Sequence, residues 1–293
     1  MAAYIGLSAL SIDGAGGPDI GVGGPRRRGD RPVPLVLLHG FTQSGASWGP
    51  LVGYLGGRLP LVLPDAPGHG GSAHVVADLW ATADLLAGLV PGPAFWAGYS
   101  MGGRMALHLA LAHPERVERL VLLSTGAGIE DHAARAARRA ADEDLARRIE
   151  DEGVETFLSW WLSQPLFATL SAERSGQEAR LVNTAPGLAS SLRTAGTGAQ
   201  EPLWHRLGEL RDRHLPVLLV AGERDARYRD QARRMAAAIG PSASLMVVPG
   251  AGHACHLEQP EVVAAALVAF CATGTGTGTG AGTGAGTAVG EGS

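Results

Sequence analysis

Three residues have the types, the order and the local context needed to activate a serine hydroxyl. Ser100 lies in a G-x-S-x-G motif at residues 98–102, directly after an apolar run and directly before a helical pattern. Asp225 and His253 follow later apolar runs, the histidine in a glycine-rich loop at residues 249–253. A serine becomes reactive when an imidazole takes its proton and a carboxylate orients that imidazole. We therefore predict that Ser100, Asp225 and His253 act as one catalytic unit.

Neighbouring residues offer alternatives for the acid and for the base. Glu223 lies nearer the preceding apolar run and Asp230 falls in the next helical pattern, so each also fits a surface charge. His256 comes three positions after His253, nearer the last helix. The G-x-S-x-G motif alone is also consistent with an ordinary strand-to-helix turn. Asp225 is favoured because sites in parallel sheets form where strands end.

The backbone around the serine predicts a site for negative charge. A His-Gly-Phe sequence at residues 39–41 ends the first clear apolar run. In folds where a G-x-S-x-G serine lies between a strand and a helix, a backbone N–H from the loop after an earlier strand reaches the nucleophile. Met101 follows Ser100 at the start of a helix, where N–H groups lack acceptors within the helix. We predict that the N–H groups of Phe41 and Met101 form an oxyanion hole. A simple turn is the alternative for residues 39–41.

The cysteines and histidines favour neither a disulfide framework nor a metal site. The chain has two cysteines, Cys255 and Cys271, and no CxxC pair. Residues 253–256 read His-Ala-Cys-His, but no second pair with ligand spacing accompanies them. We therefore expect no metal and no cofactor, and a reducing, cytoplasmic location.

Six short apolar runs alternate with helical patterns and predict a mostly parallel sheet buried on both faces. The runs cover residues 35–38, 61–63, 94–97, 120–123, 217–220 and 245–248. Helical patterns cover residues 104–111, 230–239 and 261–270. The alternation breaks between about residues 127 and 213, where arginine- and alanine-rich helical sequence and two adjacent tryptophans occur without a strand signal. An inserted helical cap explains this break.

The resulting domain organisation has five segments. Residues 1–30 are a leader or an edge hairpin, residues 31–126 the first part of the core, and residues 127–212 the cap. Residues 213–272 complete the core. The Gly/Thr/Ala-rich residues 273–293 have little to bury and are predicted to be a disordered tail.

Composition excludes several classes of partner. The 293-residue chain is 45% hydrophobic and carries a net charge of −4, so it lacks the basic surface that nucleic acid or an anionic membrane requires. It contains neither a run long enough to span a membrane nor the order of features of a signal peptide. All 24 cationic side chains are arginine, a residue suited to binding carboxylates. We expect a small-molecule partner and a monomer or small homo-oligomer.

Residues 33–271 resemble the α/β-hydrolase superfamily in four motifs, at residues 38–41, 64–70, 98–102 and 222–225. Residues 98–104, the arginine-rich segment 128–149 and residues 161–167 more narrowly resemble the 2-succinyl-6-hydroxy-2,4-cyclohexadiene-1-carboxylate synthases of menaquinone biosynthesis. That resemblance implies that the chain has an α/β-hydrolase fold with a helical cap and that it is a lyase. Its triad acts as a base in eliminating pyruvate from 2-succinyl-5-enolpyruvyl-6-hydroxy-3-cyclohexene-1-carboxylate, a polycarboxylate, without a cofactor.

The same resemblance implies a set of substrate-binding residues: Tyr99, Arg104, Arg138 and Trp161. Arg104 lies four residues after Ser100, so both side chains can share one helix face. Two features complicate the cap residues. Arg135 and Arg139 flank Arg138, and Asp142 is placed to pair with it; Trp160 adjoins Trp161, and either tryptophan also fits a core position.

Two other functions fit the same triad. A carboxylesterase or carbon–carbon bond hydrolase would use Ser100 to attack a carbonyl, followed by water. A non-catalytic small-molecule receptor would keep only the pocket. The intact set of serine, acid and histidine argues against the receptor, whereas the triad alone does not separate elimination from hydrolysis.

Overall fold

A seven-stranded sheet forms the centre of the computed structural model, which describes residues 7–12 and 32–272. The strand order is β1-β3-β2-β4-β5-β6-β7. β1 pairs antiparallel with β3, and the other neighbouring pairs are parallel. The strands are β1 (Ala9–Ile12), β2 (Leu35–Leu38), β3 (Leu61–Pro64), β4 (Ala94–Tyr99), β5 (Val117–Leu123), β6 (Val217–Gly222) and β7 (Ala243–Val248). This mostly parallel sheet confirms the predicted fold class.

Helices cover both faces of the sheet, because successive strand side chains point to opposite faces. Val36 and Leu38 of β2 join the core under α2 (Leu79–Ala87), α3 (Met101–Ala112) and α8 (Ala226–Ile239). Leu35 and Leu37 join the core under α1 (Gly49–Leu55) and α10 (Pro260–Ala272), which follows the short α9 (Cys255–Glu258). The continuous apolar runs in the sequence reflect this double burial.

The two edge strands differ from a uniformly buried sheet. β7 lies at one edge, and its Leu245 is 37% exposed, so the expectation of burial on both faces is wrong for this run. β1 lies at the other edge, where residues 9–12 pair with β3. Residues 1–6 and 13–30 of the predicted leader, and the predicted disordered tail at residues 273–293, lie outside the described residues.

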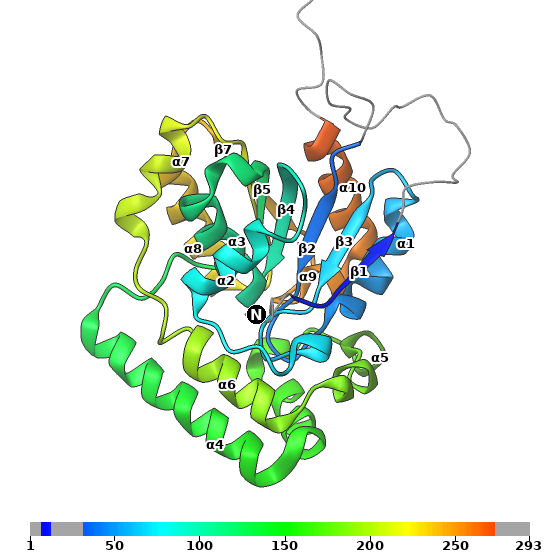
Figure 1. The fold of residues 1–293 in the computed structure, drawn as a ribbon, viewed down its shortest axis with the longest axis vertical. Helices are drawn as coiled ribbons and strands as arrows, with labels where there is room; N and C mark the ends of the chain where they lie inside the picture. Colours follow the sequence, from blue (N-terminus) through cyan, green and yellow to red (C-terminus); the bar gives the residue numbers. More distant parts are fainter. Residues whose placement is uncertain (1–6, 13–31, 273–293) are drawn as a thin grey trace, which may run out of the picture.

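The predicted helical insertion lies between β5 and β6 and is confirmed. It contains α4 (His132–Leu162), α5 (Ala172–Ser175), α6 (Ala185–Ala195) and α7 (Gly208–Asp212). α4 bends at Gly153, whose φ of 78° is not helical. α4 and α6 pack together beyond the ends of the strands (Figure 1), around a cluster that includes Phe157 and Leu188. Leu210 of α7 instead packs into the core beside α3 and α8.

Among the helices that the structure describes, none combines the length and the apolar composition needed to cross a lipid bilayer.

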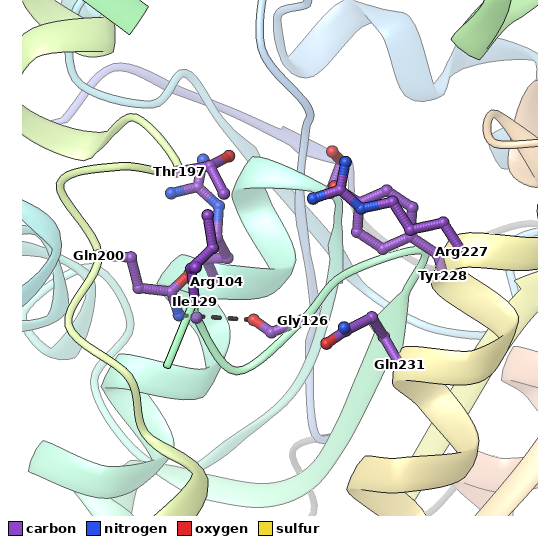
Figure 2. A pocket seen from close by; sticks show the side chains of 10 residues that line it. Arg104, Gly126, Ile129, Thr197, Gln200, Arg227, Tyr228 and Gln231 are labelled. Atoms are coloured by element: carbon purple, nitrogen blue, oxygen red, sulfur yellow. Dashed lines mark hydrogen bonds between the residues drawn. The ribbon is translucent and has the colours of Figure 1, made fainter. Parts of the chain in front are cut away.

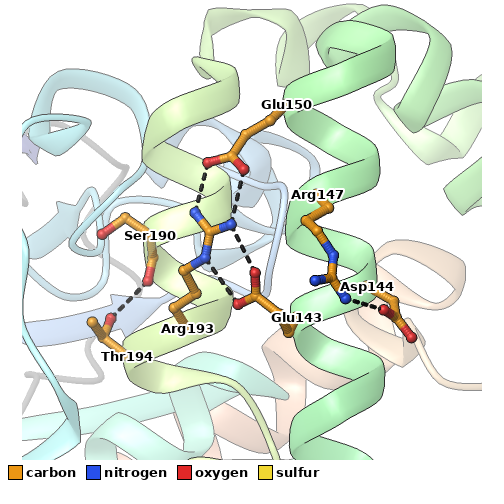
Figure 3. A network of polar contacts seen from close by, with 7 residues as sticks. All are labelled: Glu143, Asp144, Arg147, Glu150, Ser190, Arg193 and Thr194. Carbon is orange, nitrogen blue, oxygen red and sulfur yellow. Dashed lines mark hydrogen bonds and ion pairs between the residues drawn. The ribbon is translucent and has the colours of Figure 1, made fainter.

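Arg193 of α6 joins the two long cap helices through two carboxylates of α4 (Figure 3). Its guanidinium lies 3.0 Å from Oε2 of Glu143 and 2.6 Å from Oε1 of Glu150. These hydrogen bonds lower the pKa of both glutamates and raise the pKa of Arg193. Because the carbonyl of Ala195 at the end of α6 binds Arg104, the network also anchors a helix that borders the site described below.

We expect Arg193→Gln to lower the unfolding temperature by about 1–3 °C at neutral pH. Since the glutamate pKa values are depressed in the folded protein, this contribution is present above their ordinary value of 4.5 and is lost as the pH falls through the depressed values. Salt should weaken it. Thermal unfolding at neutral and acid pH, in low and high salt, measures the effect. Arg233→Gln, which removes one exposed pair with Asp230, is the control, and a difference insensitive to both pH and salt would contradict the ionic origin.

Candidate active site

Ser100 lies on a strained turn between β4 and α3. Its φ of 51° and ψ of −107° are unusual for a residue with a side chain. The turn is held by the Ser100 N–H, which donates to Leu123 O at 2.8 Å, and by Thr125 Oγ1, which donates to Ser100 O at 2.8 Å. A Cβ on Gly98 would overlap the Gly102 carbonyl, and one on Gly102 would overlap the Leu38 carbonyl. Both motif glycines are therefore required by close backbone approach.

Gly102→Ala is expected to destabilise the fold by about 3 kcal/mol or more, because the overlapping atoms belong to backbone that cannot move independently. Denaturant unfolding measures the loss. Gly53→Ala, in the exposed middle of α1, is the matched control: its Cβ would meet open space, and we expect about 0.5–1 kcal/mol of stabilisation. Equal effects of the two substitutions would argue against the steric account.

The structure brings Ser100, His253 and Asp225 into one hydrogen-bonded chain. His253 Nε2 lies 3.1 Å from Ser100 Oγ, and His253 Nδ1 lies 2.7 Å from Asp225 Oδ2. The second carboxylate oxygen of Asp225 accepts from the N–H of Tyr228 at the start of α8, at 3.2 Å. His253 and Asp225 are buried. This geometry leaves Nε2 placed to accept the serine proton, with the imidazole oriented by the carboxylate.

The alternative acids and base lie elsewhere. Glu223 is exposed and accepts from the N–H of Gly250, whereas Asp230 pairs with Arg233. His256 is buried against the rings of Trp48 and Tyr99, with centroid distances of 4.6 and 4.2 Å. Burial lowers the pKa of His256 well below its ordinary value, so it stays neutral. None of these three contacts Ser100 through a hydrogen bond among the described residues.

The two predicted oxyanion donors lie on neighbouring segments. Met101 is the first residue of α3, so its N–H has no acceptor within the helix. The first turn of α3 packs tightly on the end of β2, because Gly102 abuts the carbonyls of Leu38 and His39. Phe41 follows in the turn, and its ring contacts those of His69 and Trp161 at 5.7 and 5.6 Å. The fold thus places both segments next to Ser100.

A small cavity of about 50 Å³ opens beside Ser100. Its lining is Ser100, Arg104, Gly126, Gly128, Ile129, Thr197, Gln200, Arg227, Tyr228 and Gln231. Figure 2 shows Arg104 and Gln200 on one side of it, with Arg227, Tyr228 and Gln231 on the other. Cationic and amide side chains beside a serine suit a small anionic group such as a carboxylate.

Arg104 is buried and donates through Nη1 to the carbonyls of Ala195 and Gly196, at 2.6 and 3.1 Å. Burial lowers its pKa to about 10, so it remains a cation at neutral pH. No carboxylate of the described residues pairs with it within 4.0 Å. A buried cation held by neutral carbonyls keeps its affinity for an anion.

The other predicted binding residues have different surroundings. Arg138 donates through Nε to Asp142 Oδ1 at 2.7 Å, and it does not line the cavity. Tyr99 is buried, with its ring 5.3 Å from that of His253. Trp161 contacts Phe41, and its buried indole N–H has no hydrogen-bond partner among the described residues. An unpaired N–H is a free donor for a bound molecule.

Arg180 is a candidate that the sequence analysis missed. It is 2% exposed, donates to Thr42 Oγ1 at 2.6 Å and to Ser175 O at 3.0 Å, and pairs with no described carboxylate within 4.0 Å. Burial lowers the pKa of Arg180 to about 10, and its positive charge acts to lower the pKa of Tyr99 and that of His256. No sequence signal identified Arg180, because it lies in the short 3₁₀ helix at residues 178–182, where α-helical spacing does not apply.

Within the described parts of the chain, no group of three or more histidine, cysteine or acidic side chains is arranged to hold a metal ion. Cys255 is buried, which raises its thiol pKa to about 12 and leaves it unreactive as a nucleophile. The chemistry therefore centres on the serine, the imidazole and the cations around them.

The chain resembles known proteins in both sequence and fold. The family model for the alpha/beta hydrolase family matches residues 35–266. A 2-succinyl-6-hydroxy-2,4-cyclohexadiene-1-carboxylate synthase of Klebsiella pneumoniae subsp. pneumoniae is 34% identical over 246 residues, 82% of this chain and 94% of the relative. A Bacillus subtilis (strain 168) relative, provisionally named as the same synthase, is 36% identical over 252 residues, covering 78% and 86%. The solved structure of MenH from S. aureus superposes with a TM-score of 0.77 at 27% identity, covering 89% and 97%.

Proposed function

This chain belongs to the alpha/beta hydrolase family and, within it, to the 2-succinyl-6-hydroxy-2,4-cyclohexadiene-1-carboxylate synthases, and from that premise we propose that it eliminates pyruvate from 2-succinyl-5-enolpyruvyl-6-hydroxy-3-cyclohexene-1-carboxylate. The observation that carries the proposal is the buried guanidinium group of Arg104, which lines the cavity beside Ser100 without a described carboxylate partner. Arg180, also buried without a described carboxylate partner, lies against Thr42, next to Phe41. A neutral ester would not compensate such charges, whereas a polycarboxylate would.

In the proposed reaction Ser100 acts as a base. His253 takes the hydroxyl proton, with Asp225 orienting the imidazole, and the serine oxygen removes a proton from a ring carbon of the substrate. The released electron pair forms a carbon–carbon double bond as the bond to the enolpyruvyl oxygen breaks. The leaving group takes up a proton and becomes pyruvate, so water is not consumed.

Backbone and cationic groups then have separate tasks in this proposal. The N–H groups of Phe41 and Met101 stabilise negative charge that develops on a substrate carbonyl oxygen, an effect worth about 3 kcal/mol per donor. Arg104 and Arg180 hold carboxylates in both the ground state and the transition state. Trp161, through its unpaired N–H, and Tyr99 line the remaining wall.

The proposed role of Arg138 depends on its ion pair with Asp142. Its guanidinium is bound to the buried Asp142, whose second oxygen accepts from the N–H of Gly198 at 2.8 Å. Its charge nevertheless lowers the pKa of Arg104, so the two cations lie within electrostatic reach. We propose that the positive charge of Arg138 makes the electrostatic potential at the anion site more positive. Arg138 contacts a substrate carboxylate directly only when that carboxylate replaces Asp142 as its partner.

The decisive test uses purified protein and the tricarboxylate substrate generated in situ by the preceding enzyme, with pyruvate release followed by a coupled dehydrogenase. Release far above the rate without protein supports the proposal. Hydrolysis of simple aryl esters with no pyruvate release would instead identify an esterase on the same triad, and binding without turnover would identify a receptor. A cytoplasmic location and the oligomeric state stay predictions from the sequence.

A further inference from the structure

Two loops beside the active site are joined by side chains that the proposed reaction does not use. The first loop, residues 39–45, follows β2, and the second loop, residues 65–71, follows the neighbouring β3. Asp65 accepts from the N–H of Gly45 and from the N–H of Gly71, each at 2.8 Å. The first loop contains Phe41, so its position fixes one of the proposed oxyanion donors.

Two buried histidines connect these loops reciprocally. His39 of the first loop accepts at Nε2 from the N–H of Ala66 in the second loop, at 3.0 Å. His69 of the second loop accepts at Nε2 from the N–H of Thr42 in the first loop, at 3.3 Å. Each Nδ1–H then donates within its own loop, to Gly40 O at 2.8 Å and to Pro67 O at 3.0 Å. We name this pair the histidine latch.

The latch acts on a strained residue next to Phe41. Thr42 has a φ of 69°, a left-handed conformation that costs free energy for a β-branched side chain. All three of its polar groups are held: its N–H by His69, its carbonyl by Asn183 Nδ2 at 2.8 Å, and its hydroxyl by Arg180. Strain of this kind persists only where surrounding contacts fix it.

We propose that His39 and His69 are positioning residues, which hold the first loop on the second so that the Phe41 N–H stays directed at the oxyanion beside Ser100. This rests on the proposed oxyanion role of Phe41, which elimination and ester hydrolysis share. Both rings act as acceptors and so must be neutral. Burial lowers the pKa of His39 to about 4 and that of His69 to about 3. The positive charge of Arg180 also lowers the pKa of His39, whereas the negative charge of Asp65 raises the pKa of His69 against the effect of burial.

A matched pair of amides at each position tests the proposal. Glutamine places an acceptor near Nε2 and keeps the bond between loops, whereas asparagine reaches only the Nδ1 position and keeps the bond within the loop. We expect His39→Asn and His69→Asn to lower kcat for pyruvate release about 10–100-fold with KM changed less than about threefold, and the glutamines to stay within about fivefold of wild type. His108→Asn, at an equally buried histidine outside both loops, is the control for lost stability.

A second readout separates this inference from the proposed reaction. The rate at which a neutral fluorophosphonate labels Ser100 depends on the oxyanion hole but not on the tricarboxylate. Slow labelling by the asparagine variants with near-normal labelling by the glutamines supports the latch, even in a protein that releases no pyruvate. Equal rates for asparagine and glutamine at both positions would overturn it. A wild-type Ser100 that neither labels nor supports pyruvate release would overturn both proposals.

Discussion

Ser100→Ala should lower kcat for pyruvate release by about 10³-fold or more while leaving the affinity for the tricarboxylate nearly unchanged. The hydroxyl is the proposed base, and its removal takes away the acceptor for the substrate proton. The arginines proposed to bind the carboxylates are untouched, because Arg104 is held by backbone carbonyls of the cap and Arg180 by Thr42 and Ser175. Steady-state kinetics and direct binding to the variant measure the two quantities.

The companion variants decide whether the residues act as one unit. His253→Ala should cost nearly as much as Ser100→Ala, and the double variant should be no slower than the worse single one, because each change interrupts the same proton path. Multiplying losses would mean that His253 and Ser100 work independently. A Ser100→Ala variant with a few per cent or more of wild-type activity would mean that another group removes the proton.

The triad could be predicted because its residues lie where the strands of a parallel sheet end. Ser100, Asp225 and His253 each follow a strand, and the sheet aligns those ends whatever the length of the intervening chain. The 125-residue gap between Ser100 and Asp225 is therefore no obstacle. The G-x-S-x-G pattern also predicted the close packing that Gly98 and Gly102 require.

The contacts of the cap side chains were harder to predict. A helical pattern in the sequence shows which side chains share one face of a helix, but it does not show which other element that face packs against. The i,i+4 spacing of Arg138 and Asp142 indicated the pair that the structure contains, yet family resemblance pointed to a substrate contact. Arg180 lies in a short 3₁₀ segment, where helical spacing carries little information. Its burial against Thr42, 138 residues earlier, follows only from the docking of the cap on the core.

Arg180→Met is expected to lower kcat/KM for the tricarboxylate about 100-fold or more, chiefly by raising KM. Methionine keeps much of the buried volume and removes the charge, so the substrate carboxylate loses a desolvated, charge-assisted partner. Arg180→Lys keeps the charge without the planar fork and should recover part of the loss. Steady-state kinetics with the in situ substrate measure all three proteins.

The same substitution removes a hydrogen bond to Thr42, so binding and loop geometry must be separated. Labelling of Ser100 by a neutral fluorophosphonate reports the loop alone. If Arg180 chiefly binds a carboxylate, Arg180→Met labels within about tenfold of wild type while pyruvate release falls much further. If both rates fall together, the guanidinium acts through Thr42, and the anion site must be assigned to Arg104 and its neighbours in the cavity. Arg233→Met, at an exposed arginine of α8 that pairs with Asp230, should leave both rates unchanged and controls for the loss of a cation elsewhere.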